Sequence, residues 1–265
     1  MSGGARLAIA GLGGRMGQAL VRCSTHQEGL TLVGGTERRE DLDLPGLPSG
    51  VTVKPTLSEL LAAEKVDVVI DFTVAEAAAE HARACAEAGV GLVLGTTGLD
   101  DAGRAALDAA AARIPIVAAP NFSVGVYVLA RLATEATRLL GPDFDAEVLE
   151  IHHRMKRDAP SGTALRLAEA VTEARGVGRE VYRTTRDGLI GARPRGELGL
   201  QTLRGGDVVG EHTVFLFGDG ERVELTHRAT SRDTFANGAL RAARWLSGRP
   251  PGMHGLGDVL GLGRD

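Results

Sequence analysis

Short apolar runs alternate with alanine-rich segments over the first 120 residues, and this alternation limits the possible folds more than any other feature of the sequence. The runs lie at 7–10, 30–33, 66–72, 92–94 and 114–118, and the alanine-rich segments include 75–88 and 101–112. Strands that alternate with helices form a parallel sheet that is covered on both faces. Because crossovers between parallel strands are right-handed, the pattern predicts an α/β fold with a Rossmann-like, doubly wound parallel sheet.

The pattern changes after a helix expected at 124–140. Four further runs resemble strands, and they lie at 147–152, 198–203, 208–217 and 222–226. The last two flank Gly218-Asp219-Gly220, which is a hairpin signal. Further helices are expected at 163–175 and 234–246, and the basic, glycine-rich stretch 183–197 is expected to be a mobile surface loop. These elements predict a second α+β domain with a mostly antiparallel sheet.

The composition excludes several classes of protein. A net charge of -4 gives no overall attraction to nucleic acid or to an anionic membrane. No apolar stretch approaches the roughly 20 residues that span a bilayer. The two cysteines, Cys23 and Cys85, lie far apart within expected helices, so the sequence predicts a reduced, cytoplasmic protein without a disulfide framework.

A glycine-rich motif, Gly11-Leu12-Gly13-Gly14-Arg15-Met16-Gly17, follows the first apolar run. It differs from the dinucleotide fingerprint G-x-G-x-x-G by one extra residue in its last interval. The motif keeps the bare backbone that faces a pyrophosphate at a helix N-terminus, and Arg15 can add charge to that contact. Taken alone, it also fits an ordinary strand-to-helix turn.

Glu37 lies 20 positions after Gly17, at the end of the second run. A carboxylate at this place holds the ribose 2′-hydroxyl of NADH. Arg38 and Arg39 follow directly, where a guanidinium can meet the 2′-phosphate of NADPH, although such a pair also occurs as a solvated charge cluster. Together with the glycine-rich motif, these residues predict a site for NADH or NADPH.

The stretch 150–164 holds the densest group of candidate catalytic residues. Five of the six residues from His152 to Arg157 are basic or titratable. A histidine can pass a proton near neutral pH, and Lys156 can supply charge or a proton. Ser161 is expected to cap the next helix, which would direct the amides of Gly162 and Thr163 at a carboxylate.

Simpler interpretations of this stretch remain open. Neighbouring residues of a strand face opposite sides of its sheet, so either His152 or His153 can be purely structural. The basic run can also be a solvated strand edge that discourages aggregation. No metal site is expected, because no cysteine or carboxylate lies at ligand spacing.

Together, these motifs closely resemble those of the 4-hydroxy-tetrahydrodipicolinate reductase (dihydrodipicolinate reductase) family, and the resemblance covers almost the whole chain. It rests on the glycine-rich motif, the stretch 150–164 and five further motifs: Asp71-Phe72-Thr73, Gly95-Thr96-Thr97-Gly98, Asn121-Phe122-Ser123-Val124-Gly125, Gly210-Glu211-His212-Thr213 and Thr234-Phe235-Ala236-Asn237-Gly238. One departure is Met155, where some members have a further histidine.

The resemblance implies a homotetramer that reduces a cyclic, imine-type dicarboxylate with NADH or NADPH on the route to diaminopimelate and lysine. It implies a dinucleotide-binding domain at 1–122, completed by 235–265, and a substrate-binding and oligomerisation domain at 123–234. The implied cofactor contacts are Gly11, Leu12, Gly13, Gly14, Arg15, Met16, Gly17, Glu37, Arg38, Gly95, Thr96, Thr97, Ala119, Pro120, Asn121 and Phe122. His152 resembles the proton donor and acceptor of the family and Lys156 its second proton donor. The implied substrate site comprises His153, Ser161, Gly162 and Thr163.

Two other classes of protein share this type of fold. A non-catalytic, nucleotide-sensing regulator would carry a helix-turn-helix or another basic module, which the sequence lacks. A related amino-acid dehydrogenase is disfavoured by the His152–Lys156 cluster and by the Ser161-Gly162-Thr163 motif that follows it. The expected partner is therefore a small dicarboxylate, with no nucleic acid or membrane.

Overall fold

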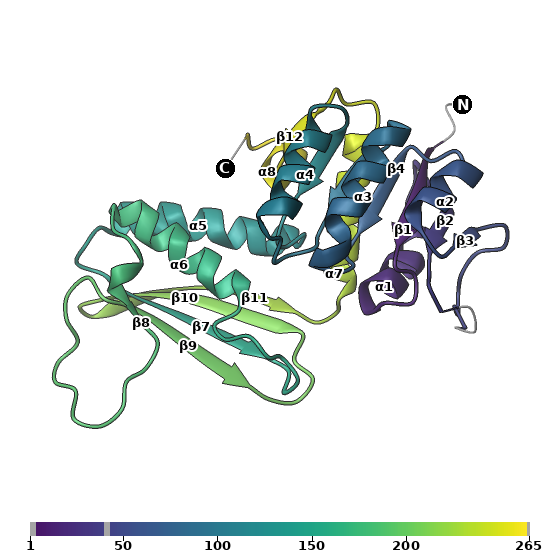
Figure 1. The fold of residues 1–265 in the computed structure, drawn as a ribbon. Coiled ribbons are helices and arrows are strands. Elements are labelled where there is room, and N and C mark those ends of the chain that lie inside the picture. Colours follow the sequence, from purple (N-terminus) through teal and green to yellow (C-terminus); the bar gives the residue numbers. More distant parts are fainter. Residues whose placement is uncertain (1–3, 40–42, 264–265) are drawn as a thin grey trace. The chain divides into compact units, whose positions relative to one another are not determined.

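The structure, a computed structural model, describes residues 4–39 and 43–263 (Figure 1). The chain divides into two compact units. The first unit combines Met1–Ser123 with the C-terminal segment Arg232–Asp265, and the second unit is Val124–Ser231. Among the described residues, no helix is both long and apolar enough to cross a membrane.

A seven-stranded sheet forms the centre of the first unit, and every strand pair in it is parallel. Its strands, in spatial order, are β12 (Gly252–His254), β6 (Pro115–Ala118), β5 (Gly91–Leu94), β4 (Val68–Asp71), β1 (Ala5–Ala10), β2 (Leu30–Thr36) and β3 (Thr52–Lys54). All residues of β4 and β5 are buried, as expected for strands that are covered on both faces.

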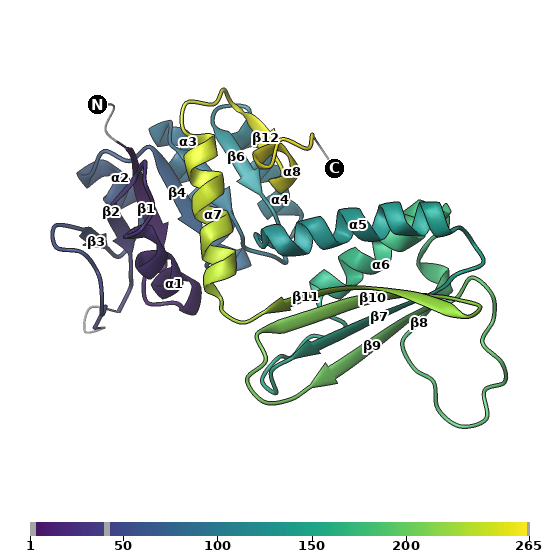
Figure 2. The ribbon, with the colours of Figure 1, turned by 180° about the vertical axis from the view of Figure 1, so that it is seen from behind.

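Helices cover both faces of this sheet. In chain order they are α1 (Arg15–Ser24), α2 (Leu57–Ala63), α3 (Ala75–Ala88), α4 (Asp101–Ala111), α7 (Asp233–Leu246) and the short α8 (Leu256–Val259). Figure 1 shows α2, α3 and α4 in front of the sheet, and Figure 2 shows α1 and α7 on the opposite face. The predicted doubly wound, Rossmann-like sheet is confirmed.

The order of the strands reverses at β1, which lies between β4 and β2. Sheets of this type bind ligands beyond the carboxyl ends of the strands at such a reversal. The glycine-rich motif begins directly after β1, at Gly11, and Asp71 is the last residue of β4. The fold therefore brings both motifs to the edge where a ligand is expected.

The second unit contains one five-stranded sheet. Its strands, in spatial order, are β11 (Glu221–Ala229), β10 (Gly210–Gly218), β7 (Asp145–His152), β9 (Leu198–Arg204) and β8 (Tyr182–Arg183). The α+β domain is confirmed, but its sheet is mixed rather than mostly antiparallel. β10 pairs antiparallel with β7 and β11, whereas β9 pairs parallel with β7 and β8. The cause is the crossover through α6 (Gly162–Arg175), which returns the chain in the original direction.

Both long helices of this unit, α5 (Val124–Leu140) and α6, lie on one side of the sheet (Figures 1 and 2). Residues of β7 are alternately buried and half-buried along the whole strand. Ala146 and Val148 join Leu129, Leu167 and other residues of the two helices in a single core. Glu150 and His152 follow on the same buried face, so two titratable side chains extend this apolar row.

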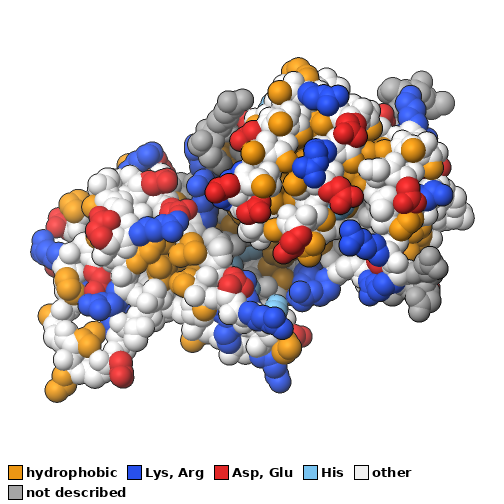
Figure 3. Space-filling view, in the orientation of Figure 1, with side chains coloured by type: hydrophobic (Ala, Val, Ile, Leu, Met, Phe, Trp, Pro, Cys, Tyr) orange, Lys and Arg blue, Asp and Glu red, His pale blue; other side chains and the backbone are white. Residues whose placement is uncertain are grey.

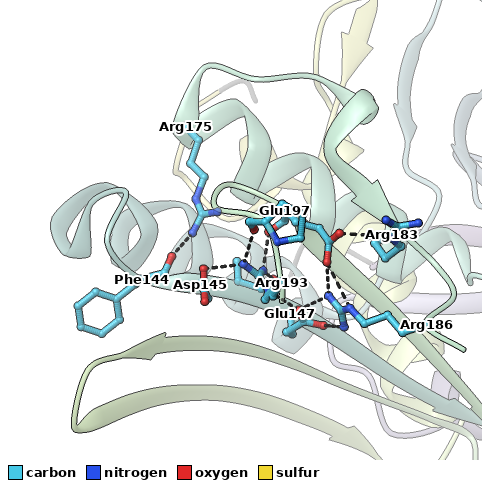
Figure 4. A network of polar contacts seen from close by, with 10 residues as sticks. Phe144, Asp145, Glu147, Arg175, Arg183, Arg186, Arg193 and Glu197 are labelled. Atoms are coloured by element: carbon cyan, nitrogen blue, oxygen red, sulfur yellow. Dashed lines mark hydrogen bonds and ion pairs between the residues drawn. The ribbon is translucent and has the colours of Figure 1, made fainter. Parts of the chain in front are cut away.

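The basic stretch 183–197 lies at the surface as expected, but it is anchored rather than free. Arg186 forms a bidentate ion pair with Glu147 of β7, with distances of 2.9 and 2.7 Å, and also contacts Glu197 (Figure 4). Arg193 pairs with Glu147 and with Asp145. Asp145 and Glu147 lie on β7, far from the loop in the chain, so these ion pairs become apparent only once the chain has folded. On the face seen in Figure 3, positive and negative side chains are interspersed.

Candidate functional site

The glycine-rich motif forms a tight turn that allows no side chains at two of its positions. Gly11 has a φ of +75°, and a Cβ atom there would lie 3.0 Å from Cγ2 of Thr73. A Cβ atom on Gly17 would lie 2.1 Å from the carbonyl oxygen of Gly11. Gly14 is the N-cap of α1 and offers no capping side chain, and the first turn of α1 carries no acidic residue. This helix N-terminus suits a phosphate group.

Glu37 lies against this turn. The amide of Gly13 donates a hydrogen bond of 2.9 Å to Oε2 of Glu37, and Nε of Arg39 lies 3.0 Å from Oε1. The contact with Arg39 is the main reason that the pKa of Glu37 falls to about 2. The carboxylate is therefore ionised and next to the predicted phosphate site. Arg39, rather than Arg38, supplies the guanidinium that contacts it.

Asp71 connects two further turns at the same edge of the sheet. Its Oδ1 accepts hydrogen bonds from the amide and the hydroxyl of Thr73, at 2.7 and 2.6 Å, and from the hydroxyl of Thr96 at 3.4 Å. Its Oδ2 lies 2.7 Å from Nδ1 of His81. Burial raises the pKa of Asp71, but these hydrogen bonds outweigh it and the net shift is downward. Asp71 thus fixes the turn after β4 and also Thr96 after β5.

The roles of Asp71 and His81 could not be assigned from the sequence. Asp71 gave only a weak signal, a carboxylate at the end of an otherwise apolar strand. His81 gave none, because it is one of several polar residues in an alanine-rich helix.

The segment Ala119–Phe122 follows β6 and completes this edge. The amide of Ala119 donates to the carbonyl of Leu94, at the end of β5. The ring of Phe122 is fully buried and packs edge-on against Phe72, with 5.5 Å between ring centroids. Thr97 and Pro120 remain exposed. The first unit therefore gathers all the predicted cofactor segments at one edge of its sheet.

In the second unit, a buried carboxylate holds His152. Glu150 is 1% exposed and His152 is 9% exposed. Nδ1 of His152 lies 2.5 Å from Oε2 of Glu150. Nη1 and Nη2 of Arg204, at the end of β9, lie 2.8 and 2.9 Å from the two carboxylate oxygens of Glu150. Burial raises the pKa of Glu150, but the hydrogen bonds from His152, Arg204 and Ser161 outweigh it and hold the pKa at about 2.

His212 of β10 lies on the other side of His152. The two rings are nearly perpendicular, with 5.1 Å between centroids. Nε2 of His212 lies 3.2 Å from Oγ of Ser161. Burial lowers the pKa of His212 to about 3, with a further contribution from the charge of His152. His212 is therefore a neutral imidazole beside a histidine that is bound to a carboxylate.

Neither Glu150 nor His212 was predicted as a site residue. Glu150 has a signal in the sequence, because residues i and i+2 of a strand share a face. The link to His212 depends on the pairing of β10 with β7, which the sequence alone does not reveal.

The remaining candidates follow β7 in the chain. His153 lies just beyond the strand, and its amide donates to the carbonyl of Val208. Lys156 is mostly buried, and its Nζ lies 2.9 Å from Oδ2 of Asp158. The charge of Lys156 is close enough to contribute to the lowered pKa of His212. The predicted proton donors thus lie in the same part of the second unit.

Ser161 caps α6 as predicted, because its Oγ accepts a hydrogen bond from the amide of Ala164. Gly162 is exposed and Thr163 is half-buried, and both lie in the first turn of the helix, which has no acidic side chain. This helix N-terminus can receive a carboxylate. Within the described ranges, no group of three or more His, Cys, Asp or Glu residues is arranged to hold a metal ion.

Comparison with known proteins gives a consistent result along the whole chain. The family model described as dihydrodipicolinate reductase, N-terminus, matches residues 5–122, and the one described as dihydrodipicolinate reductase, C-terminus, matches residues 125–260. A 4-hydroxy-tetrahydrodipicolinate reductase of Myxococcus xanthus is 56% identical, and the match covers 98% of each chain. One from Anaeromyxobacter dehalogenans (strain 2CP-1 / ATCC BAA-258) is 50% identical over 97% of this chain and 98% of its own.

A solved structure extends the comparison to three dimensions. Dihydrodipicolinate reductase from Paenisporosarcina sp. TG-14, with dipicolinate bound, has a TM-score of 0.77 and 27% sequence identity, and the match covers 95% of this chain and 97% of that one. The family models, the sequence relatives and the fold all agree. This chain therefore belongs to the dihydrodipicolinate reductase family.

Proposed function

We propose that this protein reduces 4-hydroxy-tetrahydrodipicolinate to tetrahydrodipicolinate with NADH or NADPH, in the cytoplasm, on the route to diaminopimelate and lysine. The observation that carries this proposal is the contact between Glu150 and His152, in a chain of this family. Lys156 and the N-terminus of α6 follow this pair in the sequence. The reduction adds a hydride and a proton to the substrate and releases its hydroxyl group as water. The two free, buried cysteines are consistent with a reducing compartment.

We assign dinucleotide binding to the first unit. The uncapped N-terminus of α1 fits the pyrophosphate, and Arg15 adds positive charge there. Glu37 fits a ribose hydroxyl, and Arg38 and Arg39 fit a 2′-phosphate. The turn Gly95–Thr97, fixed through Asp71, and the segment Ala119–Phe122 would hold the nicotinamide end. When bound, the nicotinamide supplies the hydride.

We assign the substrate and the proton transfers to the second unit. The amides of Gly162 and Thr163, with the Ser161 cap and His153, bind a substrate carboxylate at the N-terminus of α6. His152 and Lys156 carry out the proton transfers, which supply the one proton that the reaction consumes with each hydride. The positive charge of Lys156 also favours a substrate that carries two carboxylates and gains electrons during the reaction.

The function is tested by following NADPH absorbance while dihydrodipicolinate synthase generates the substrate in place. Turnover is expected, and pyridine-2,6-dicarboxylate is expected to compete with the substrate and not with NADPH. Thr163→Val should weaken this inhibitor about tenfold, the effect of losing one hydrogen bond to a charged group, without changing NADPH affinity. Absence of turnover, or an inhibitor that competes only with NADPH, would refute the assignment.

Both NADH and NADPH are expected to support turnover, because Glu37 suits a free ribose hydroxyl while Arg38 and Arg39 suit a 2′-phosphate. Replacing Arg38 and Arg39 together by alanine should raise KM for NADPH about tenfold or more, since charge-assisted hydrogen bonds to the phosphate are lost. KM for NADH should change much less. Steady-state kinetics measure KM for each cofactor in the variant. Equal increases in KM for NADPH and for NADH would contradict the placement of the 2′-phosphate.

We also propose that four chains associate through the second sheet. The face turned away from α5 and α6 carries Leu149, Ile151, Leu203, Phe215 and Phe217. Leu203 is 50% exposed, and the rings of Phe215 and Phe217 stack with 5.6 Å between centroids. An apolar face of this kind is typical of an interface between protein chains.

The solution mass is expected to be four times that of one chain. Leu203→Glu should reduce it, because the substitution places a charge in the middle of the apolar face. Leu139→Glu is the matched control, since Leu139 is a largely exposed leucine on α5. Light scattering after gel filtration measures both variants. A wild-type protein that runs as a monomer, or a mass unaffected by Leu203→Glu, would overturn this proposal.

A further inference from the structure

The carboxylate of Glu150 has an unusually complete set of hydrogen-bond donors. Oε1 accepts from the amide of Ser161 at 3.0 Å, from the hydroxyl of Thr202 at 3.2 Å and from Nη2 of Arg204. Oε2 faces Nδ1 of His152 and Nη1 of Arg204. A carboxylate surrounded in this way is ionised and fixed in orientation.

An ionised carboxylate can only accept hydrogen bonds. The short contact with Glu150 therefore requires a proton on Nδ1 of His152. In the neutral imidazole, the other ring nitrogen must then be the unprotonated one. Nε2 is thus the atom of His152 that can take up a proton and release it.

The surroundings of His152 keep this nitrogen uncrowded. A Cβ atom on Gly210 would lie 3.0 Å from Nε2, so glycine at this position leaves room beside it. His212 stacks edge-on against the ring, and its own Nε2 is bound to Ser161 rather than to His152. His227 and Lys156 also act electrostatically on His212, and Lys156 pairs with Asp158.

We propose that Glu150, clamped by Arg204, is a positioning residue for the reduction: it keeps one proton on Nδ1 of His152 and so commits Nε2 to proton transfer. This role rests on the proposed function, in which His152 exchanges a proton with the substrate. Glu150 itself does not touch the substrate. The arrangement resembles the use of a buried carboxylate to fix a histidine tautomer in other enzymes.

The test combines kinetics with a direct measurement of the tautomer. Glu150→Gln is expected to lower kcat roughly 10²-fold, because the amide no longer enforces the proton on Nδ1. KM for the substrate and Kd for NADPH should stay within about threefold. Glu197→Gln is the matched control, since Glu197 is also a buried carboxylate of this unit held by two arginines, but it does not contact His152. Its kcat should be close to wild type.

A double mutant separates positioning from a general loss of structure. If Glu150 acts through His152, then Glu150→Gln should cost little in a chain that already carries His152→Gln. A full additional loss in the double mutant would show that Glu150 acts independently, and would overturn the proposal. So would a wild-type kcat in Glu150→Gln.

Nitrogen-15 NMR of the histidine rings in the wild-type protein needs neither substrate nor variant, so it remains decisive if Glu150→Gln fails to fold. Neutral His152 is expected to carry its proton on Nδ1, and a proton on Nε2 would refute the proposal. This result is independent of the proposed function, which fails separately if the wild-type enzyme does not oxidise NADPH in the presence of substrate.

Discussion

Replacing His152 with glutamine is expected to lower kcat by roughly 10²- to 10⁴-fold, the usual contribution of a general acid or base. Glutamine has a similar size and can still form a hydrogen bond to Glu150, so the fold should persist. What it lacks is a nitrogen that gains and loses a proton near neutral pH. Stopped-flow or steady-state NADPH oxidation measures the loss.

Cofactor binding provides the control for this variant. His152 belongs to the second unit, whereas all the proposed cofactor contacts belong to the first. Calorimetry should therefore give nearly the same Kd for NADPH in His152→Gln and in the wild type. If NADPH binding disappears together with turnover, His152 is a structural residue, which is the alternative that the strand geometry leaves open.

Lys156→Arg is expected to lower kcat by at least about tenfold while the fold and the affinity for NADPH remain. The composition makes this lysine conspicuous: the chain has 30 lysines and arginines, and its only lysines are Lys54, Lys65 and Lys156. An arginine at position 156 would keep the positive charge and could still pair with Asp158. It could not give up a proton, because a guanidinium stays protonated in proteins.

Lys65→Arg is the matched control for this substitution. The described contact of Lys65 is through its backbone carbonyl, which accepts from Arg6, so the exchange of side chain should leave activity unchanged. Parallel assays of the two variants isolate the effect of position 156. Near wild-type turnover in Lys156→Arg would show that Lys156 only supplies charge, and would leave His152 as the single proton donor.

Some strands could be predicted because their apolar character is intrinsic. β1, β4 and β5 are buried on both faces and therefore appear as continuous apolar runs. β3 and β12 have three residues each at the two edges of the sheet, and they were missed. Such short edge strands gain their stability from neighbours distant in the chain, so their own residues carry little signal.

The candidate site divides in the same way. Some features have local causes that can be recognised in the sequence, namely the turn that needs glycine at Gly11 and Gly17 and the helix that Ser161 caps. Contacts between strands have no such local cause. Arg204 and His212 reach Glu150 and His152 only because β9 and β10 flank β7, and that pairing is a property of the folded sheet.

The first unit is assembled from both ends of the chain, and this has a consequence for its biogenesis. α7 packs against α1 and against β4, β5 and β6, and β12 extends the sheet beyond β6. During synthesis α7 and β12 emerge from the ribosome after the whole second unit. Until then the face of the nascent sheet that carries α1 lacks α7, and β6 is an open edge, which is a site for misassembly with other chains. The residues of the second unit are contiguous, so this unit can fold before α7 and β12 have been synthesised.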